Sequence, residues 1–455
     1  MTRPRAPYDL HEVDQLRLAV GADMVPEAEH ARTMLARSLA FDATVYGLAA
    51  VHQYAQMCPQ VSGPTAVGFN VFDHQTELAT PGFAPFRTPN VDTLYSNAWL
   101  DLTAGPVALH VPAMGARYYT LQFCDAHANA TNLSSRTVGP DGGDFLVTLP
   151  GWSGVVPPGH EVFTVATPHV WILMRIAFDG TDAGLDEVRS LQSEVAVQAP
   201  PRSATVSPAV TLDSVEEHPE HFLAALDAVL RTNGTPWDEV ALVRRYRPIG
   251  VGGPDPFDAA RLDTATRIGI ALGFREAMDV VRSSRSQFGE HTASGWMTGT
   301  VGENGFHYLR RAVQNFVGTG GNVREEKIFF VAFDDGDGVP LDGATANYLV
   351  TFAPQPPVHG HWSLTMYDVV TRGLVANTLE RYAVGPWTPG VPGDGPVTIE
   401  IGARDGGRGD VFLPAPTSGF YVDLRLWQPA QTIRAGAWTP PAIRRVALVS
   451  DDKSS

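Results

Sequence analysis

Residues 85–102 read PFRTPNVDTLYSNAWLDL and place a run of polar side chains directly before an apolar stretch. Pro89 favours an extended conformation at the residue before it, and Asn90 suits a turn in which the side chain bonds to the backbone that follows. Asp92 and Thr93 are typical caps of a short helical turn. A core strand is expected in the apolar residues that come next. The stretch therefore predicts that the chain enters a β-sheet through a short hydrogen-bonded segment.

Short apolar runs separated by turn signals continue from about residue 86 to residue 175. Runs of this kind, bounded by Gly, Pro and Asp, are typical of antiparallel strands. Apolar residues at helical spacing predict a long helix from Pro26 towards Cys58, and a second helix is expected over 185–197. The expected strands are Val107–Val111, Tyr118–Cys124, Phe145–Leu149 and Val170–Arg175.

The pattern becomes helical over about 215–321, where Pro219 starts one expected helix and Gly318 stops another. Strands return from Lys327 onward, and their Gly-, Asp- and Pro-rich connections are typical of an antiparallel sandwich or barrel. The expected fold class is α+β, with two antiparallel β-rich modules and a helical section between them. The expected divisions are an N-terminal helix plus β module (1–200), a helical connecting section (201–322) and a C-terminal antiparallel β module (323–455).

The composition is that of a globular protein, with 44% hydrophobic and 18% charged residues. A net charge of −16 and a pI near 5.3 disfavour nucleic acid and anionic membranes as partners. The N-terminus lacks the apolar run of a signal peptide, so a cytoplasmic location is expected. Cys58 and Cys124 have neither zinc-site nor disulfide-framework spacing. Lys327 and Lys453 are the only lysines among 33 basic residues.

Several common functional motifs are missing from the sequence. It has no GxxxxGK[ST] phosphate loop and no GxSxG nucleophile elbow. The glycines at 318–321 lack the GxGxxG spacing and are better explained as a helix end. The run DDGDGVPLDG at 334–343 lacks the remaining ligands of a calcium loop, and its Asp-Gly pairs predict a hairpin turn.

Asp92 and Tyr95 are the candidate acid–base residues of the opening stretch. In a helical turn these two side chains would share one face, three residues apart. A phenol needs a nearby cation to ionise close to neutral pH, and Arg117 is one candidate for that cation. The alternative is that Asn90, Asp92 and Thr93 only hold the turn together, in a buried polar network without catalytic function.

His359 and His361 alternate on an expected strand, so their imidazoles would share one side of it. Two imidazoles on one face form half of many transition-metal sites, and His127 or Asp125 would complete the site if the modules meet. The alternative is a polar patch beside a Pro-Pro turn. We therefore expect no cofactor, with a divalent transition metal as the alternative.

Aromatic residues of the second β module are expected in its core, because aromatics dominate the inner faces of β-sandwiches. Arg381 and Arg425 differ, because an arginine among apolar strand residues needs a partner. A structural carboxylate is expected first, and a substrate carboxylate or phosphate second. The aromatic residues in question are Trp362, Tyr367, Tyr421 and Trp427.

Six stretches of the sequence resemble the signatures of two known families. TPNVDTLYSNAWLDLTAGPVALHVP and ARYYTLQFCDAHANATNLSSRTVG are similar to domain of unknown function 1254. PLDGATANYLVTFAPQPPVHGHWSLTMYD, GLVANTLERYAVG, VFLPAP and FYVDLRLWQP are similar to its usual partner, domain of unknown function 1214. His361 stands where that family usually has an aromatic residue, as does His127 in the first module.

The resemblance implies two β-rich modules packed with helices, and a homo-oligomer. By similarity, signature positions of the two families supply the remaining candidate residues. We expect an enzyme that acts on a small organic, anionic metabolite by acid–base chemistry between the modules, in specialised metabolism. The alternatives are a non-catalytic ligand-binding or assembly protein and a His-based metal enzyme. The candidate catalytic residues are Asp92, Tyr95 and Asp125, and the candidate substrate-binding residues are Asn90, Arg117, Tyr118, Trp362, Tyr367 and Arg381.

Overall fold

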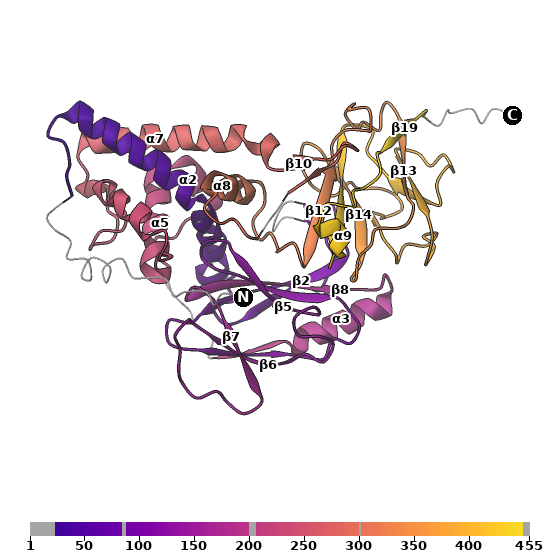
Figure 1. Cartoon of the computed structure of the whole chain (residues 1–455), viewed down its shortest axis with the longest axis horizontal. Coiled ribbons are helices and arrows are strands. Elements are labelled where there is room, and N and C mark those ends of the chain that lie inside the picture. The colour runs from indigo at the N-terminus through magenta and orange to yellow at the C-terminus, as the bar shows by residue number, and fades with distance from the viewer. Residues whose placement is uncertain (1–22, 84–87, 200–205, 300–301, 449–455) are drawn as a thin grey trace.

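The computed structural model describes residues 23–83, 88–199, 206–299 and 302–448, which form two β-rich parts and a group of helices (Figure 1). The N-terminal β module lies at the bottom of this view, the helices at the upper left and the C-terminal β module at the right. This arrangement confirms the expected α+β class, with two mainly antiparallel β regions and helices between them in sequence.

The N-terminal β module contains two sheets packed against each other. One has the strand order β1-β2-β8-β4-β5 and is antiparallel throughout. The other has the order β7-β6-β3-β9, in which β6 and β7 pair in parallel. The elements are β1 (Phe72–His74), β2 (Thr93–Asp101), β3 (Val107–Val111), β4 (Tyr119–Cys124), β5 (Ala130–Ser134), β6 (Gly143–Thr148), β7 (His160–Thr164), β8 (His169–Ala177), α3 (Asp182–Glu194) and β9 (Ala196–Gln198).

The central strands β2 and β8 are buried on both faces. In β2, Leu94 and Ala98 lie in the core between the two sheets, whereas Tyr95 and Trp99 belong to a cluster formed mainly by the helices. Strand residues alternate between faces, so each strand contributes to two different interiors. Arg175 on β8 lies directly opposite Tyr95 and therefore shares its face. This placement puts a charged residue inside an apolar strand.

The helical part is built around α2, whose apolar residues form one cluster with those of α5, α7 and α8. The close approach of α2 and α7 depends on a glycine, because a Cβ on Gly273 would lie 2.1 Å from the carbonyl oxygen of Arg37. Gly318 ends α8, as expected. The elements are α2 (Glu29–Ser62), α4 (Leu212–Glu217), α5 (Pro219–Asn233), α6 (Val240–Val243), η1 (Arg244–Ile249), η2 (Ala259–Arg261), α7 (Thr264–Ser283), η3 (Arg285–Gln287) and α8 (Tyr308–Val317).

One helix in the described residues, α2, is long and apolar enough to cross a membrane by length and composition alone. However, 61% of its most apolar window is buried against the rest of the protein. Packing against α5, α7 and α8 therefore accounts for its apolar character.

The C-terminal β module also contains two sheets, with its core between them. The larger has the order β10-β11-β12-β18-β14-β15, and the smaller has the order β17-β16-β13-β19 with one parallel pair, β16 and β17. The elements are β10 (Glu290–His291), β11 (Met297–Thr298), β12 (Lys327–Ala332), β13 (Asn347–Phe352), β14 (Trp362–Asp368), β15 (Ala383–Val384), β16 (Val397–Gly402), β17 (Val411–Pro414), β18 (Phe420–Trp427), α9 (Gln431–Arg434) and β19 (Arg444–Val446).

The segment 334–343 closes locally, with a bridge between Asp334 and Pro340, but β12 and β13 do not pair with each other. The predicted hairpin turn is therefore confirmed locally, although it does not join two paired strands. The Asp335 side chain accepts hydrogen bonds from the backbone amides of Asp337 and Val339 and holds the turn. The chain then crosses to the second sheet, so the Asp-Gly signal marks a turn within a sheet-to-sheet connection.

Candidate functional site

A row of polar and aromatic side chains lies on the outer face of the larger C-terminal sheet. The even-numbered residues of β18 from Val422 to Leu426 enter the module core, so its odd-numbered residues project from the opposite face. Trp427 pairs with Lys327 on β12, and its backbone amide donates to the carbonyl oxygen of His361 at 2.9 Å. Because neighbouring strands lie about 4.8 Å apart, the backbones of Lys327 and His361 flank Trp427 at roughly 10 Å from each other.

The N-terminal module places three side chains against this row. The Trp427 indole Nε1 donates to Oδ2 of Asp92 at 2.9 Å. The Tyr118 ring lies 5.2 Å from the Trp427 ring, and the Arg175 guanidinium carbon lies 6.0 Å from its centroid. Trp427 is thus the common neighbour of a group of residues from both modules. We call this group the junction site: Asp92, Tyr118, Arg175, Lys327, His361 and Trp427.

Asp92 is fully buried and ionised at the start of β2. Its Oδ2 lies 3.3 Å from Nε2 of His361. Burial alone would raise the pKa of Asp92, but the neighbouring His361 and the charge of Arg425 outweigh it and lower that pKa to about 2. A carboxylate held ionised beside an imidazole forms a pair that can take up and release a proton on the ring.

The opening stretch forms the expected Asx turn but not the expected helical turn. Oδ1 of Asn90 accepts from the backbone amides of Asp92 at 3.2 Å and Thr93 at 3.0 Å. Strand β2 already begins at Thr93, because pairing with β8 starts there, so Asp92 and Tyr95 do not share a helix face. The Tyr95 hydroxyl accepts from the Asn90 side-chain amide at 2.6 Å. Burial raises the pKa of Tyr95, so its phenol stays protonated at neutral pH.

Arg425 has the structural carboxylate partner that its position in an apolar strand predicted. Its Nη2 lies 2.9 Å from Oδ2 of Asp423, and both side chains are buried. The same guanidinium donates to the hydroxyl of Thr365 and, across the module boundary, to the carbonyl oxygen of Thr88. Arg425 is therefore a structural residue that ties the two modules together.

Arg175 and Lys327 differ from Arg425 in the groups that they contact. Arg175 donates to Gln122 at 2.7 Å and to the carbonyl oxygen of Gly320 at 3.4 Å. Lys327 Nζ lies 5.7 Å from the Trp427 ring centroid. Within the described residues, neither cation forms an ion pair with a carboxylate, and the buried Tyr118 hydroxyl has no hydrogen-bond partner. The junction site therefore combines two basic side chains without a direct carboxylate partner in the described residues with a hydroxyl that forms no hydrogen bond.

The other sequence-predicted residues contact different neighbours. Arg117 donates to the carbonyl oxygen of Ala177 and pairs with Glu187 on α3. The Asp125 carboxylate accepts from the backbone amides of His127 and Asn129 and holds a turn. The remaining ones pair as follows: Arg381 with the carbonyl oxygen of Phe412, Trp362 with Gln355, and Tyr367 with the carbonyl oxygen of Pro89 across the module boundary.

The histidines do not lie as the metal-site alternative required. His359 and His361 precede β14 in a bend, so the prediction that they alternate on a strand was wrong. Val358 bridges Pro429 one residue out of register with the pairing of Trp362 and Leu426, so the chain bulges between Val358 and Trp362. His127 is buried, which lowers its pKa. Among the described residues, no three His, Cys, Asp or Glu side chains are close enough to hold a metal ion.

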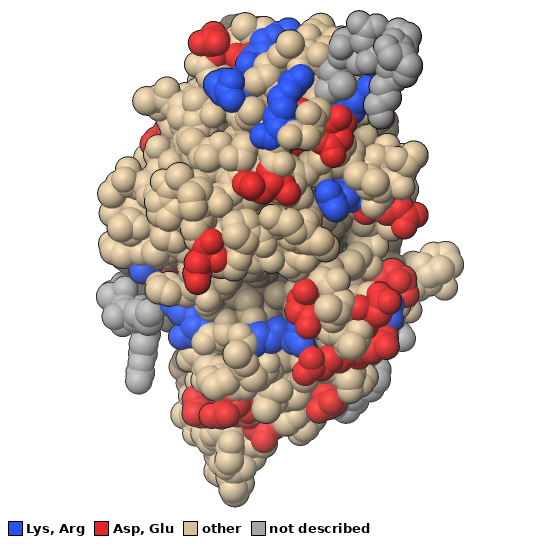
Figure 2. Space-filling view, turned by 90° about the vertical axis from the view of Figure 1, so that its right-hand side faces the viewer, with Lys and Arg blue, Asp and Glu red and all other residues tan. Residues whose placement is uncertain are grey.

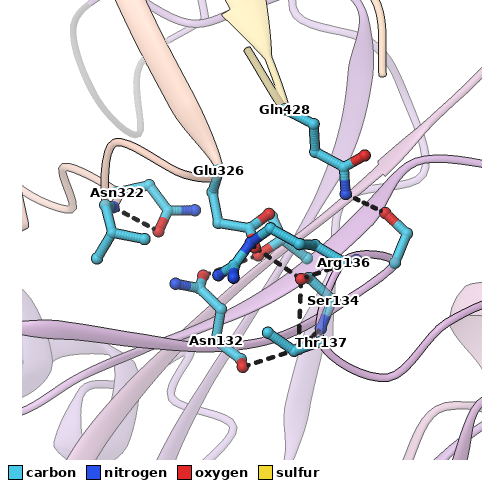
Figure 3. Close-up of polar contacts among 10 residues, drawn as sticks. Asn132, Ser134, Arg136, Thr137, Asn322, Glu326 and Gln428 are labelled. Atoms are coloured by element: carbon cyan, nitrogen blue, oxygen red, sulfur yellow. Dashed lines mark hydrogen bonds and ion pairs between the residues drawn. The ribbon is translucent and has the colours of Figure 1, made fainter. Parts of the chain in front are cut away.

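Glu326, next to Lys327, anchors the same boundary (Figure 3). This fully buried side chain accepts from the Ser134 hydroxyl at 2.7 Å and from Nε of Arg136 at 2.8 Å. Gln428 adds a second link, with its amide donating to the Ser135 hydroxyl at 2.7 Å. Oε2 of Glu326 is buried without a hydrogen bond in the part of the chain that the structure describes.

We expect Glu326→Gln to leave the free energy of unfolding unchanged or to raise it at pH 7. Burial raises the pKa of Glu326 above that of the unfolded chain, so the folded protein binds the extra proton and loses stability as pH rises through this window. Glutamine mimics the protonated form and removes that loss. Urea unfolding at pH 7 measures the free energy of unfolding. The exposed Glu276→Gln is the control, and it should differ from wild type by less than about 0.5 kcal/mol. A clear loss of stability only in Glu326→Gln would contradict the argument.

Two cavities lie outside the junction site. One of about 260 Å³ is lined by Asp125, Asn129, Thr131 and apolar residues, and one of about 450 Å³ lies between η3 and α8. The face seen in Figure 2 carries a hollow between the C-terminal module above and the N-terminal module below, with basic side chains along its lower edge. A ligand could reach the boundary between the modules through this hollow.

Sequence reasoning named Asp92, Tyr118 and His361 but missed Arg175 and Lys327 as site residues. Two signals pointed to them. Arg175 is the charged residue in the apolar run Val170–Phe178, and Lys327 is one of two lysines in the chain. Neither signal predicts a site until the structure brings β8 and β12 close to Trp427 on β18.

Comparison with known proteins agrees with the two-module architecture. Residues 69–199 match the family described as protein of unknown function (DUF1254), and residues 326–431 match protein of unknown function (DUF1214). The crystal structure of the VPA0106 protein from Vibrio parahaemolyticus is similar, with a TM-score of 0.69 and 24% identity over 90% of this chain and 100% of that chain.

A crystal structure of a putative uncharacterized protein from Burkholderia cenocepacia gives a TM-score of 0.43 and 11% identity over 96% of this chain and 94% of that chain. No curated protein matches the sequence. The similarity to the Vibrio protein supports the fold alone, while the two matches in their expected order identify the modules. The chain therefore belongs to the two-module family that combines DUF1254 at its N-terminal side with DUF1214 at its C-terminal side.

Proposed function

We propose that the protein is an enzyme that binds a small anionic organic molecule at the junction site and acts on it by acid–base chemistry. The observation that supports this most is the pair Arg175 and Lys327, two cations beside one tryptophan without a carboxylate partner in the described residues. The guanidinium of Arg175 is buried, and a buried charge without an ionic partner is costly unless a counter-charge arrives. An anionic ligand would supply it.

Recognition would come from the guanidinium and the aromatic rings. A guanidinium presents several N–H donors in one plane and suits carboxylate and phosphate groups. The rings of Trp427 and Tyr118 would pack against the organic part, and the Tyr118 hydroxyl would gain a partner. Among the described residues this is a mixed charged and aromatic setting, which suits an organic anion better than an inorganic one.

Proton transfer would fall to His361, with Asp92 as the residue that orients it and stays ionised. Tyr95 and Asp125 would not share this role, since the phenol is protonated and the Asp125 carboxylate holds a turn. Rings of Trp427 and Trp387 lie 5.6 and 5.8 Å from the His361 ring and shield it from bulk water.

A non-catalytic ligand-binding or assembly role is the second candidate. The bond between Trp427 and the fully buried Asp92 favours it, because that contact also fastens the modules to each other. The two candidates differ in whether the bound anion is changed, and a turnover experiment separates them.

Binding is tested with benzoate as the probe, by calorimetric titration at pH 7. We expect wild type to bind benzoate and Arg175→Met to bind it about 10- to 100-fold more weakly, as a charge-assisted hydrogen bond contributes about 1.5–3 kcal/mol. The exposed Arg189→Met, on α3, is the matched control and should bind as wild type does. Circular dichroism confirms that both variants are folded. Equal affinities in the three proteins, or no binding at all, would contradict the proposal.

Turnover is tested by incubating the protein with a mixture of small metabolites and following their loss by mass spectrometry. An anionic compound should disappear with wild type and about 10²-fold or more slowly with His361→Gln, the size of a general acid–base contribution. Benzoate binding without consumption of any compound would favour the non-catalytic role.

A further inference from the structure

Lys327 occupies an unusual place for an amine. Its Nζ lies 5.5 Å from the Phe329 ring and 5.7 Å from the Trp427 ring, and the side chain is only partly buried. Within the described residues it has no hydrogen-bond acceptor or carboxylate at its Nζ. An ammonium group held between ring faces, without an acceptor for its protons, lacks the partners that normally keep a lysine inert.

Burial and the neighbouring positive charges both favour the neutral form of this amine. Burial lowers the pKa of Lys327 most, and the positive charges of Arg425 and Arg175 lower it further, while Asp423 and Asp92 oppose them. The result is a pKa of about 7. At pH 7 roughly half of the amine would then be neutral, against about 0.04% of a lysine with the reference pKa of about 10.4. A neutral amine is the form that attacks a carbonyl carbon.

Building on the proposed function, we infer that Lys327 captures the substrate as an imine, so that the substrate is a small 2-oxo acid or an aldehyde that carries an acidic group. The neutral amine adds to the carbonyl carbon, and a proton passes from nitrogen to the former carbonyl oxygen. The carbinolamine then loses one water molecule and leaves the imine. No oxidant or reductant takes part.

The position of Arg175 limits where the acidic group sits. Arg175 and Lys327 both lie within about 6 Å of the Trp427 ring centroid. The positive charge of Arg175 also lowers the pKa of Lys327, so the two groups lie near each other. In the inferred complex the acidic group would lie on the Arg175 guanidinium and the carbonyl group at Lys327. Compounds in which an acid and a carbonyl are close neighbours fit this spacing, which is why 2-oxo acids come first.

Reductive trapping tests the inference directly, with pyruvate as the probe and sodium cyanoborohydride as the reductant. Peptide mapping should place one adduct on Lys327, formed at least tenfold faster at pH 7 than the adduct on Lys453, the other lysine in the sequence. The rate at Lys327 should level off above about pH 7, whereas an ordinary lysine continues to gain reactivity towards pH 10.

Variants separate this result from unspecific labelling. Lys327→Arg keeps the charge and should lose the fast adduct, while Lys453→Arg should retain it, and circular dichroism verifies that both are folded. Benzoate in excess should slow labelling of Lys327 but not of Lys453. The inference is overturned if, in folded wild type, Lys453 is labelled as fast as Lys327. It is also overturned if Lys327 is not labelled at all.

Two further outcomes distinguish this inference from the proposed function. If benzoate binds through Arg175 but Lys327 gives no adduct, the imine step is wrong and the anion site stands. If Lys327 is labelled at a rate that neither benzoate nor Arg175→Met changes, the shared site for anion and carbonyl is wrong.

Discussion

Replacing Arg425 with methionine is expected to lower the free energy of unfolding by about 3–5 kcal/mol, the cost of breaking a buried ion pair from one side. Asp423 would keep its charge in a buried position without the guanidinium 2.9 Å away. The Thr88 carbonyl oxygen would also lose its donor from the other module. Urea unfolding at pH 7 measures the loss.

The exposed Arg261, which pairs with Asp255, provides the matched control. Because solvent screens that pair, Arg261→Met should change the free energy of unfolding by less than about 1 kcal/mol. Similar small losses in both variants would show that Arg425 does not hold the modules together.

Asp92→Asn is expected to lower the free energy of unfolding by about 2.5 kcal/mol at pH 7. The pKa of Asp92 is about 2 in the folded protein, against about 3.9 in an unfolded chain, and each pKa unit corresponds to about 1.4 kcal/mol. A carboxylate whose pKa is lower in the folded protein stabilises the fold at pH values above its pKa in the unfolded chain. This stabilisation is lost as the pH falls through the folded-state pKa. The difference between wild type and variant should therefore shrink as pH falls from about 4 to about 2.

Urea unfolding of the two proteins at pH 7 and pH 3 measures this narrowing, since titration of all other carboxylates is common to both. The sign is opposite to that expected for Glu326→Gln, which removes a carboxylate whose pKa is raised. A gap between wild type and Asp92→Asn that is the same at both pH values would mean that shape, not charge, determines the contribution of Asp92.

The strands were predictable from the sequence because period-two patterns and turn residues are local signals. The expected strand Val107–Val111 agrees with the structure at both ends. Errors arose where a distant partner decides the local structure. Strand β2 already starts at Thr93, before the apolar residues, because β8 pairs with it from there. His361 lies outside β14 because one extra residue bulges between the pairs Val358–Pro429 and Trp362–Leu426.

The candidate site was only partly predictable, because it depends on register between strands far apart in the sequence. The neighbours of Trp427 come from residues about 60 to 100 positions earlier in its own module, and Asp92 comes from the other module. The sequence singled out Asp92 by its polar surroundings and His361 by its departure from the family pattern. Which cation would face them is fixed by the pairing of β12 with β18 in one sheet and by the contact of Arg175 on β8 with the Trp427 ring, and no local pattern encodes that.

The central claim is that the junction site binds an organic anion, and a crystal structure with 4-bromobenzoate tests it most directly. The bromine gives an anomalous signal that locates the ring, and the carboxylate shows which cation holds it. We predict a single bromine peak beside Trp427, with the carboxylate on the guanidinium of Arg175. A compound bound only in the cavity between η3 and α8 or on the surface, with the side chains of the junction site packed against one another, would contradict the account.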